Sequence, residues 1–151
     1  MGLSNTTGGQ GMIVADASVV TFLFLEGELS GIARELYTID PEWVTPPILN
    51  HEMLNILAAV GSAEGNVQGM EELWREARGV LGSRQQIPDP QRSLRLAIEL
   101  GISGYQAQYL ALADQLKLPL LTTDALLLEL LPKKTFRPEI YLEARRSGRP
   151  V

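Results

Sequence analysis

The stretch Met12-Ile-Val-Ala-Asp16 is the part of this 151-residue chain from which the fold can be worked out. Its run of apolar residues predicts a short buried strand that ends at an acid. A helix is predicted directly after it, from Ser18 to Glu26. The same succession of a short apolar run and a helix returns further along the chain.

Strands and helices alternate outward from this first strand. Further strands are predicted at residues 42–45, at 84–87 before a break at two prolines, and at 119–122. Helices are predicted at 30–37, 46–60, 71–81, 90–100, 103–117 and 125–131. Because no hairpin signal joins the strands, we expect an α/β fold. Its form should be three-layer α/β/α, with a central parallel sheet of four to five strands.

Length and composition indicate one domain. We expect residues 1–11 to be a flexible N-terminal tail and residues 12–151 to be a single domain. Its end, residues 133–151, is a basic C-terminal segment in which we expect a last short strand and a tail. The absence of cysteine excludes disulfides and thiolate metal sites. No apolar run is long enough to cross a membrane and no secretory signal is present, so we expect a cytoplasmic protein with no membrane partner.

The charge is unevenly spread along the chain. Residues 1–72 hold ten acids and one base, a balance of −9, whereas residues 73–151 hold twelve bases and eight acids, a balance of +4. An acidic half beside a basic half suggests a polyanionic substrate met through a cation. The plainer explanation is that surface charge drifts along any chain.

Three acids are predicted to meet at one edge of the sheet. Asp16 follows the first strand, Asp124 follows the strand at 119–122, and Glu52 lies early in the helix after the second strand. Ligands of such sheets bind at the carboxyl ends of the strands. Carboxylates gathered there favour a hard divalent cation such as Mg²⁺ or Mn²⁺. Each acid also has a plainer explanation, because an aspartate can cap the helix that follows it and Glu52 can be a solvated helix residue.

Four blocks of sequence stand out in this order. They are Met12-Ile-Val-Ala-Asp16-Ala-Ser18, then Pro47 through Glu52 to Asn55, then Ile102-Ser-Gly-Tyr105-Gln106-Ala-Gln-Tyr-Leu-Ala-Leu-Ala113, and finally Leu121-Thr122-Thr123-Asp124 with Leu127. In their order and spacing the blocks resemble the PIN domain family, the nuclease fold of the VapC toxins. The resemblance covers residues 12–131.

The resemblance implies a metal-dependent endoribonuclease, the toxin of a type II toxin–antitoxin pair. Asp16, Glu52 and Asp124 would hold Mg²⁺ or Mn²⁺, and the metal would activate a water that attacks an RNA phosphodiester. Gln106 would fill the fourth corner of the site. Supporting positions are Ser18, Asn55 and Thr122. Such toxins usually form homodimers and are silenced by a cognate antitoxin protein.

Gln106 departs from the family pattern, which usually has aspartate at this position. A glutamine carbonyl can still bind a hard cation but brings no charge. The pattern Ser103-x-x-Gln106 is also a capping box, which explains the glutamine without any metal. This leaves open a catalytically weakened PIN-like module that binds RNA or a protein partner. A third hypothesis is a phosphoryl-transfer enzyme with Asp16 as nucleophile, but neither a second acid two residues on nor a lysine after Thr122 is present.

The remaining polar and aromatic candidates have ordinary structural explanations. We expect His51, the one histidine, to be solvated, and without cysteine or a second histidine no common zinc site is predicted. Trp43 and Trp74 are interpreted as packing residues. The bases of the C-terminal segment can contact phosphates or form a solvated face. They are Lys133, Lys134, Arg137, Arg145, Arg146 and Arg149.

Overall fold

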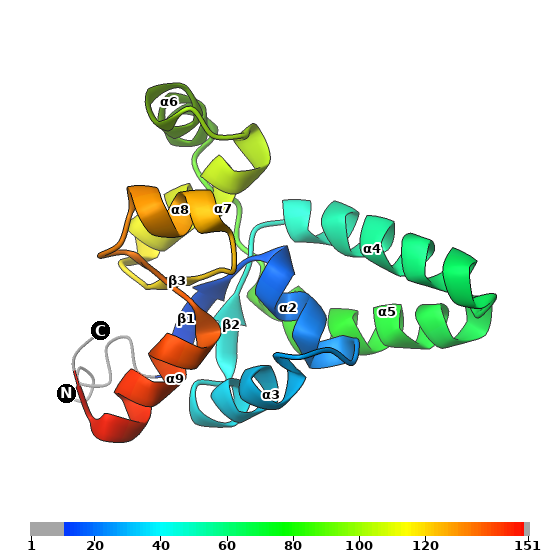
Figure 1. Ribbon diagram of the computed structural model, residues 1–151. Helices are drawn as coiled ribbons and strands as arrows, with labels where there is room; N and C mark the ends of the chain where they lie inside the picture. Colours follow the sequence, from blue (N-terminus) through cyan, green and yellow to red (C-terminus); the bar gives the residue numbers. More distant parts are fainter. Residues whose placement is uncertain (1–10, 150–151) are drawn as a thin grey trace.

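Four parallel strands form the central sheet of the protein, whose computed structural model describes residues 11–149. The strands lie in the order β2-β1-β3-β4 (Figure 1). Their bounds are β1 Met12–Ala15, β2 Glu42–Val44, β3 Leu120–Leu121 and β4 Thr135–Phe136. Val14 of β1 is in register with Val44 on one side and with Leu120 on the other. The predicted α/β class with a parallel sheet is therefore confirmed. The predicted tail, apart from Gly11, lies outside the described residues.

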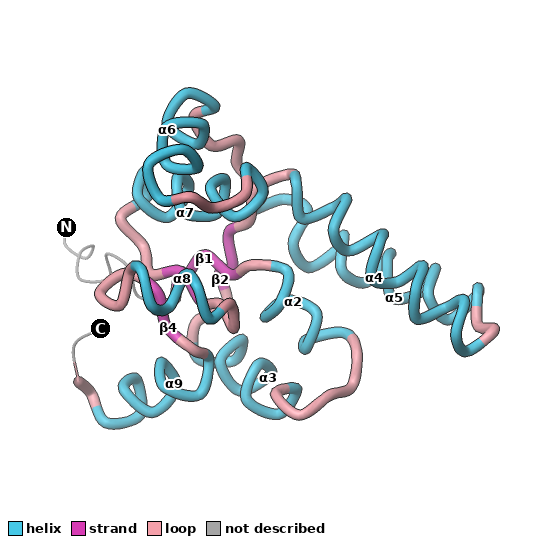
Figure 2. Tube along the Cα trace, turned by 45° about the horizontal axis from the view of Figure 1, so that its top comes forward, coloured by secondary structure: helices cyan, strands magenta, loops and turns pink. Residues whose placement is uncertain are grey.

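Helices cover both faces of this sheet and complete the three layers, as Figures 1 and 2 show from two directions. They are α2 Ala17–Phe24, α3 Ser30–Ile39, α4 Ile48–Glu64, α5 Val67–Leu81, the 3-10 helix η1 Gly82–Arg84, α6 Pro90–Leu100, α7 Gly104–Leu116, α8 Ala125–Leu130 and α9 Pro138–Ser147. On one face Ile13 and Ala15 pack with α2, α3, α4 and α9. On the other face Val14 packs with α7 and α8.

The central strands are apolar throughout because both of their faces are covered. Ile13, Val14 and Ala15 are fully buried, and so are Leu120 and Leu121 of β3. A strand buried on both sides needs a continuous apolar run instead of an alternating one. This requirement explains why such short segments could be recognised as strands.

Helices α4 and α5 form a hairpin that extends away from the sheet (Figure 1). Gly65 ends α4 in the left-handed conformation with φ of 64°, where glycine has no steric cost. Asn66 then caps α5 by accepting a hydrogen bond from the Gly69 N–H. The short connection between β2 and α4 keeps the start of α4, near which Glu52 lies, close to the sheet.

Two sequence predictions were wrong, one for residues 84–87 and one for the C-terminal segment. Residues 84–87 do not form a strand: η1 takes up Arg84, and only Gln85 makes an isolated bridge, to Thr45. Pro88 and Pro90 follow, and proline cannot donate to a ladder, so pairing stops at this sheet edge. The C-terminal segment contains the predicted short strand, β4, but helix α9 stands where a tail was expected.

Within the described part of the chain, no helix combines the length and the apolar composition that crossing a membrane requires.

Candidate functional site

The predicted site residues lie at the topological switch point of the sheet. The chain goes from β1 outward to β2, and then returns to the other side of β1 with β3 and β4. Asp16 follows β1 and Asp124 follows β3, so both stand at the carboxyl ends of the two central strands. This is the edge at which open α/β sheets bind ligands.

Asp16 is buried and is held only by neutral donors. Its Oδ1 accepts hydrogen bonds from the Ser18 N–H at 3.0 Å and from the Ser18 hydroxyl at 2.6 Å, and its Oδ2 accepts from the Thr122 hydroxyl. Burial raises the pKa of Asp16 to about 6, although the bonds from Ser18 and Thr122 act in the opposite direction. Among residues 11–149 no basic side chain forms an ion pair with it. Asp16 is also the N-cap of α2, so the capping role and the place at the site coexist.

Asp124 uses one carboxylate oxygen locally and the other across the site. Its Oδ1 accepts from the Leu127 N–H at 3.1 Å and so caps α8. Its Oδ2 accepts from the side-chain amide of Gln106 at 2.6 Å. The Gln106 carbonyl oxygen accepts from the Ser103 N–H at 2.9 Å, which completes the predicted capping box. It is therefore the amide NH₂, and not the carbonyl, that Gln106 turns toward Asp124.

Glu52 reaches the same pocket from α4. Its Oε1 accepts a hydrogen bond of 2.6 Å from the hydroxyl of Tyr109 on α7. Burial and the bond to Glu52 raise the pKa of the Tyr109 phenol, so the hydroxyl keeps its proton and acts as the donor. Tyr109 was missed as a site residue in the sequence. The available signal was its spacing, because it lies three residues after Gln106 on the same side of a helix.

These groups line one pocket of about 240 Å³. Its walls are Asp16, Ala17, Ser18, Glu52, Gln106, Tyr109, Thr123 and Asp124, all of them described residues and none of them basic. The three predicted acids are thus brought to one cavity. In residues 11–149, however, no three histidine or acidic side chains are gathered closely enough to form a group that could hold a metal ion.

The chemistry of these groups fits a hard divalent cation better than their spacing does. The donors are carboxylate, hydroxyl and amide groups, and oxygen ligands are those that Mg²⁺ and Mn²⁺ prefer. Asp16 is a buried acid without a cationic partner in the described chain. A cation from outside would reduce the free-energy cost of ionising this buried carboxyl group. Against this, Gln106 presents hydrogens and not oxygen to Asp124.

Ser18 and Thr122 link the start of α2 to the segment that follows β3. The Ser18 hydroxyl accepts from the Thr123 N–H at 3.0 Å, and the Thr122 hydroxyl accepts from the Asp124 N–H at 3.0 Å. Each hydroxyl also donates to Asp16, so both orient this carboxylate. Asn55, by contrast, is exposed and lies outside the lining of the pocket, as does His51.

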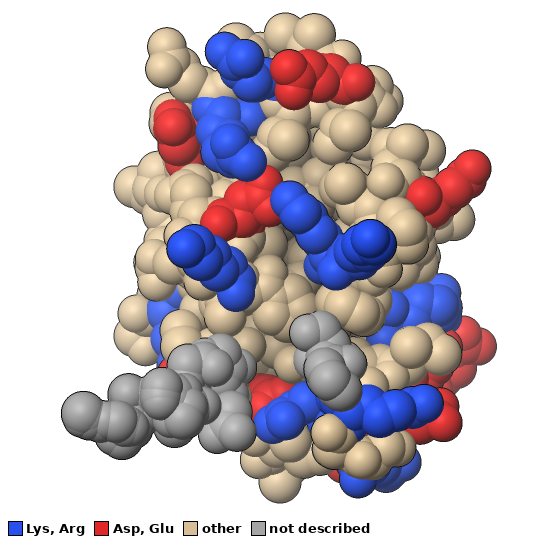
Figure 3. Space-filling model, turned by 90° about the vertical axis from the view of Figure 1, so that its left-hand side faces the viewer, with Lys and Arg blue, Asp and Glu red and all other residues tan. Residues whose placement is uncertain are grey.

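The basic C-terminal segment is largely paired with acids of the same fold. Arg145 binds Asp40 through two bonds of 2.8 and 2.9 Å, and Lys134 binds Asp114 at 2.9 Å. Arg137, Arg146 and Arg149 pair with Glu139, Glu35 and Glu143. Figure 3 shows Lys and Arg side chains interspersed with Asp and Glu side chains on one face of the molecule. These bases therefore have structural partners already.

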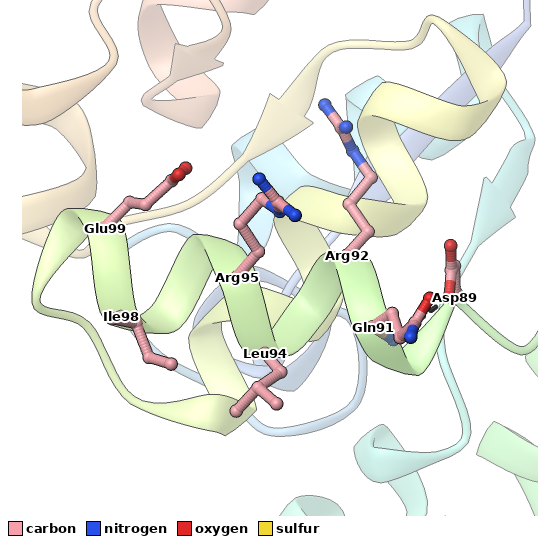
Figure 4. A pocket seen from close by; sticks show the side chains of 7 residues that line it. All are labelled: Asp89, Gln91, Arg92, Leu94, Arg95, Ile98 and Glu99. Carbon is pink, nitrogen blue, oxygen red and sulfur yellow. Dashed lines mark hydrogen bonds between the residues drawn. The ribbon is translucent and has the colours of Figure 1, made fainter.

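A second hollow, of about 600 Å³, lies along α6 (Figure 4) and shares no lining residue with the acidic pocket. Except for Asp89 just before the helix, its lining comes from α6 alone. Arg92, one of the lining residues, also binds Asp114 at 2.7 Å. The hollow contains no member of the predicted site, so it does not compete with the acidic pocket as the site of chemistry.

The fold is similar to that of a protein of solved structure, PAE2754 from Pyrobaculum aerophilum. The TM-score is 0.68, the sequence identity is 22%, and the match covers 90% of this chain and 98% of that chain. At this identity the similarity establishes the fold alone. No protein-family model matches the chain, and no curated protein matches it either.

Proposed function

We propose that this protein is a metal-dependent endoribonuclease. The observation that carries the proposal is the pocket at the switch point, where three acids from three separate elements meet and no described lining residue is basic. A cluster of acids without a cation is the expected environment for an enzyme that recruits a divalent ion. The resemblance of the sequence blocks to PIN domains supplies RNA as the substrate.

In this function Asp16, Glu52 and Asp124 hold the ion. Bound Mg²⁺ or Mn²⁺ supplies an activated water and neutralises charge on the phosphate. Ser18 and Thr122 keep the Asp16 carboxylate fixed, because each donates a hydrogen bond to it. Tyr109 fixes Glu52 in the same way, because its hydroxyl donates a hydrogen bond to Oε1.

The same proposal includes the biological setting that the resemblance implies. The protein acts in the cytoplasm as the toxin of a type II toxin–antitoxin pair. It works as a homodimer, and a cognate antitoxin protein suppresses it. These statements are proposals that rest on the sequence blocks between residues 12 and 131.

The test is an RNA cleavage assay with the purified chain in Mg²⁺ or Mn²⁺, at fixed ionic strength. We expect cleavage that a chelator abolishes and that Asp16→Asn reduces by at least about a hundredfold, because losing a residue that only orients a metal ligand already costs about 10–100-fold. Gln108→Ala, on the same helix as Gln106 but outside the pocket lining, is the matched control and should keep its activity. Metal-independent cleavage, or equal cleavage by Asp16→Asn, would contradict the proposal.

One observation favours a second candidate, a module that binds RNA or a protein partner without cleaving. Gln106 directs its NH₂ to Asp124 and brings no charge to the fourth corner of the site. RNA binding measured by fluorescence anisotropy distinguishes the two candidates. Binding without cleavage at every metal concentration would support the binding module.

A further inference from the structure

Gln106 makes contacts at both ends of its side-chain amide, and the two contacts fix its orientation. The carbonyl oxygen accepts from the Ser103 N–H at 2.9 Å, while the nitrogen donates to Asp124 at 2.6 Å. Turning the amide over would set an NH₂ against an N–H and a carbonyl against a carboxylate. The capping box of α7 therefore determines which end of the amide meets the acid.

Asp124 is satisfied by protein donors on both of its oxygens. Gln106 occupies Oδ2, and the Leu127 N–H occupies Oδ1. A second neutral donor on the same side of α7, Tyr109, holds Glu52 in a comparable way. One helix thus supplies hydrogen bonds to acids of two other elements, α4 and the start of α8.

We propose that Gln106 is a positioning residue that takes, at Asp124, the place a cation would otherwise fill. It joins the start of α7 to the start of α8 and keeps the Asp124 carboxylate in the pocket without metal. The amide occupies one of the lone-pair directions of Oδ2 and therefore competes with an ion for this oxygen. The part of this inference that concerns metal rests on the proposed function, whereas the part that concerns the bond between Gln106 and Asp124 does not.

The first measurement is the melting temperature of Gln106→Glu in a chelator at pH 8. Glutamate serves the capping box as well as glutamine, so the start of α7 is preserved. The new carboxylate faces Asp124 and cannot donate to it. We expect the melting temperature to fall by about 5 °C, since a charge-assisted hydrogen bond becomes a like-charge contact in a domain of this length.

A double variant exchanges the donor and the acceptor of the hydrogen bond between residues 106 and 124. In Gln106→Glu/Asp124→Asn, asparagine still caps α8, because Asn and Asp are equivalent at this position. Its amide can donate to the substituted carboxylate, so the bond is restored in reverse. We expect the melting temperature of the double variant to return to within about 2 °C of the wild type, which corresponds to at most about 1 kcal/mol in a domain of this length. Additive losses in the double variant would overturn the inference and leave Gln106 as a capping residue only.

Titration with Mn²⁺ tests the part of the inference that concerns metal. Gln106→Glu adds a carboxylate and removes the competing amide, so we expect Mn²⁺ to bind roughly tenfold more tightly than to the wild type. Gln108→Glu adds the same charge outside the pocket and should leave Mn²⁺ affinity unchanged. Equal Mn²⁺ affinity of wild type and Gln106→Glu would overturn the metal part. If neither protein binds Mn²⁺, the proposed function fails, while the exchange of donor and acceptor still decides the role of Gln106.

Discussion

Asp16 and Asp40 are both buried aspartates, but they lie at opposite ends of the sheet. The groups that stabilise their negative charges also differ. Asp40, fully buried between α3 and β2, receives two bonds from Arg145 and one from the Gly11 N–H. Asp16, at the carboxyl end of β1, receives bonds only from Ser18 and Thr122 and has a raised pKa of about 6.

The difference separates an acid that serves the fold from an acid that is available to a ligand. A buried charge is tolerated when a partner of opposite charge is built into the protein. Where only hydroxyls and amides are provided, part of the cost of burial remains, and a cation from outside can relieve it. Four predictions on stability test this difference, with the largest expected effect first and the smallest last.

Breaking the ion pair between Arg145 and Asp40 should have the largest effect on stability. Arg145→Met leaves Asp40 buried with only the Gly11 N–H and the nearby Tyr141, and we expect a loss of about 3–5 kcal/mol of unfolding free energy. Chemical denaturation at pH 7 measures it. Arg146→Met is the matched control, since Arg146 pairs with Glu35 on the surface and should change stability by at most about 0.5 kcal/mol. Similar losses in the two variants would show that burial of Asp40 does not matter.

Replacing the Asp16 carboxylate, which receives its hydrogen bonds from neutral donors, should stabilise the metal-free protein. The folded pKa of Asp16, about 6, lies above its ordinary value of 3.8. The unfolded chain therefore ionises first, and the folded protein loses stability as pH rises between these values, by up to about 3 kcal/mol above pH 6. Asp16→Asn escapes this loss and still caps α2. We expect it to be the more stable protein at pH 8 by about 2 kcal/mol and equal to wild type near pH 4.

Thermal melts in a chelator from pH 4 to pH 8, at constant ionic strength, measure this difference. A variant that is less stable than wild type at pH 8 would mean that the Asp16 charge is itself stabilised by the fold. The contrast with Asp40 would then disappear.

Added Mn²⁺ should stabilise the folded protein by binding at the buried charge of Asp16. Mn²⁺ at a hundred times its dissociation constant should stabilise the wild type by about 2.7 kcal/mol, seen as a rise in melting temperature. Asp16→Asn should lose most of this rise, whereas Arg146→Met should keep it because its substitution lies on the surface. An equal rise in all three proteins would place the ion elsewhere on the chain.

Removing one neutral donor should have the smallest effect. Tyr109→Phe takes the hydroxyl from Glu52, which is only partly buried, so water can replace the bond. We expect a loss of about 1 kcal/mol, with the core packing of the ring retained. Chemical denaturation checks the value. A loss as large as that of Arg145→Met would show that Glu52 depends on Tyr109 as Asp40 depends on arginine.

The sequence predicted the elements whose burial leaves a strong pattern. The strands β1 and β3 were recognisable because a strand covered on both faces is apolar throughout, and the acids after them marked their carboxyl ends. Helix α9 was missed because its segment is rich in charged residues. Arg145 and Arg146 gain their partners Asp40 and Glu35 only in the folded chain. The segment 84–87 was wrongly predicted as a strand because Ile87, apolar but exposed, resembled a core residue.

By itself the sequence determined the interactions between residues that are close along the chain. The capping box of Ser103 and Gln106 and the caps at Asp16 and Asp124 join groups no more than three residues apart, so local backbone geometry is sufficient for them. The contacts that make a site of these groups join residues far apart: Gln106 to Asp124 across 18 positions, Tyr109 to Glu52 across 57, and Thr122 to Asp16 across 106. Only the tertiary structure decided them, because the free end of an amide or a carboxylate has no preferred partner until packing brings one within reach.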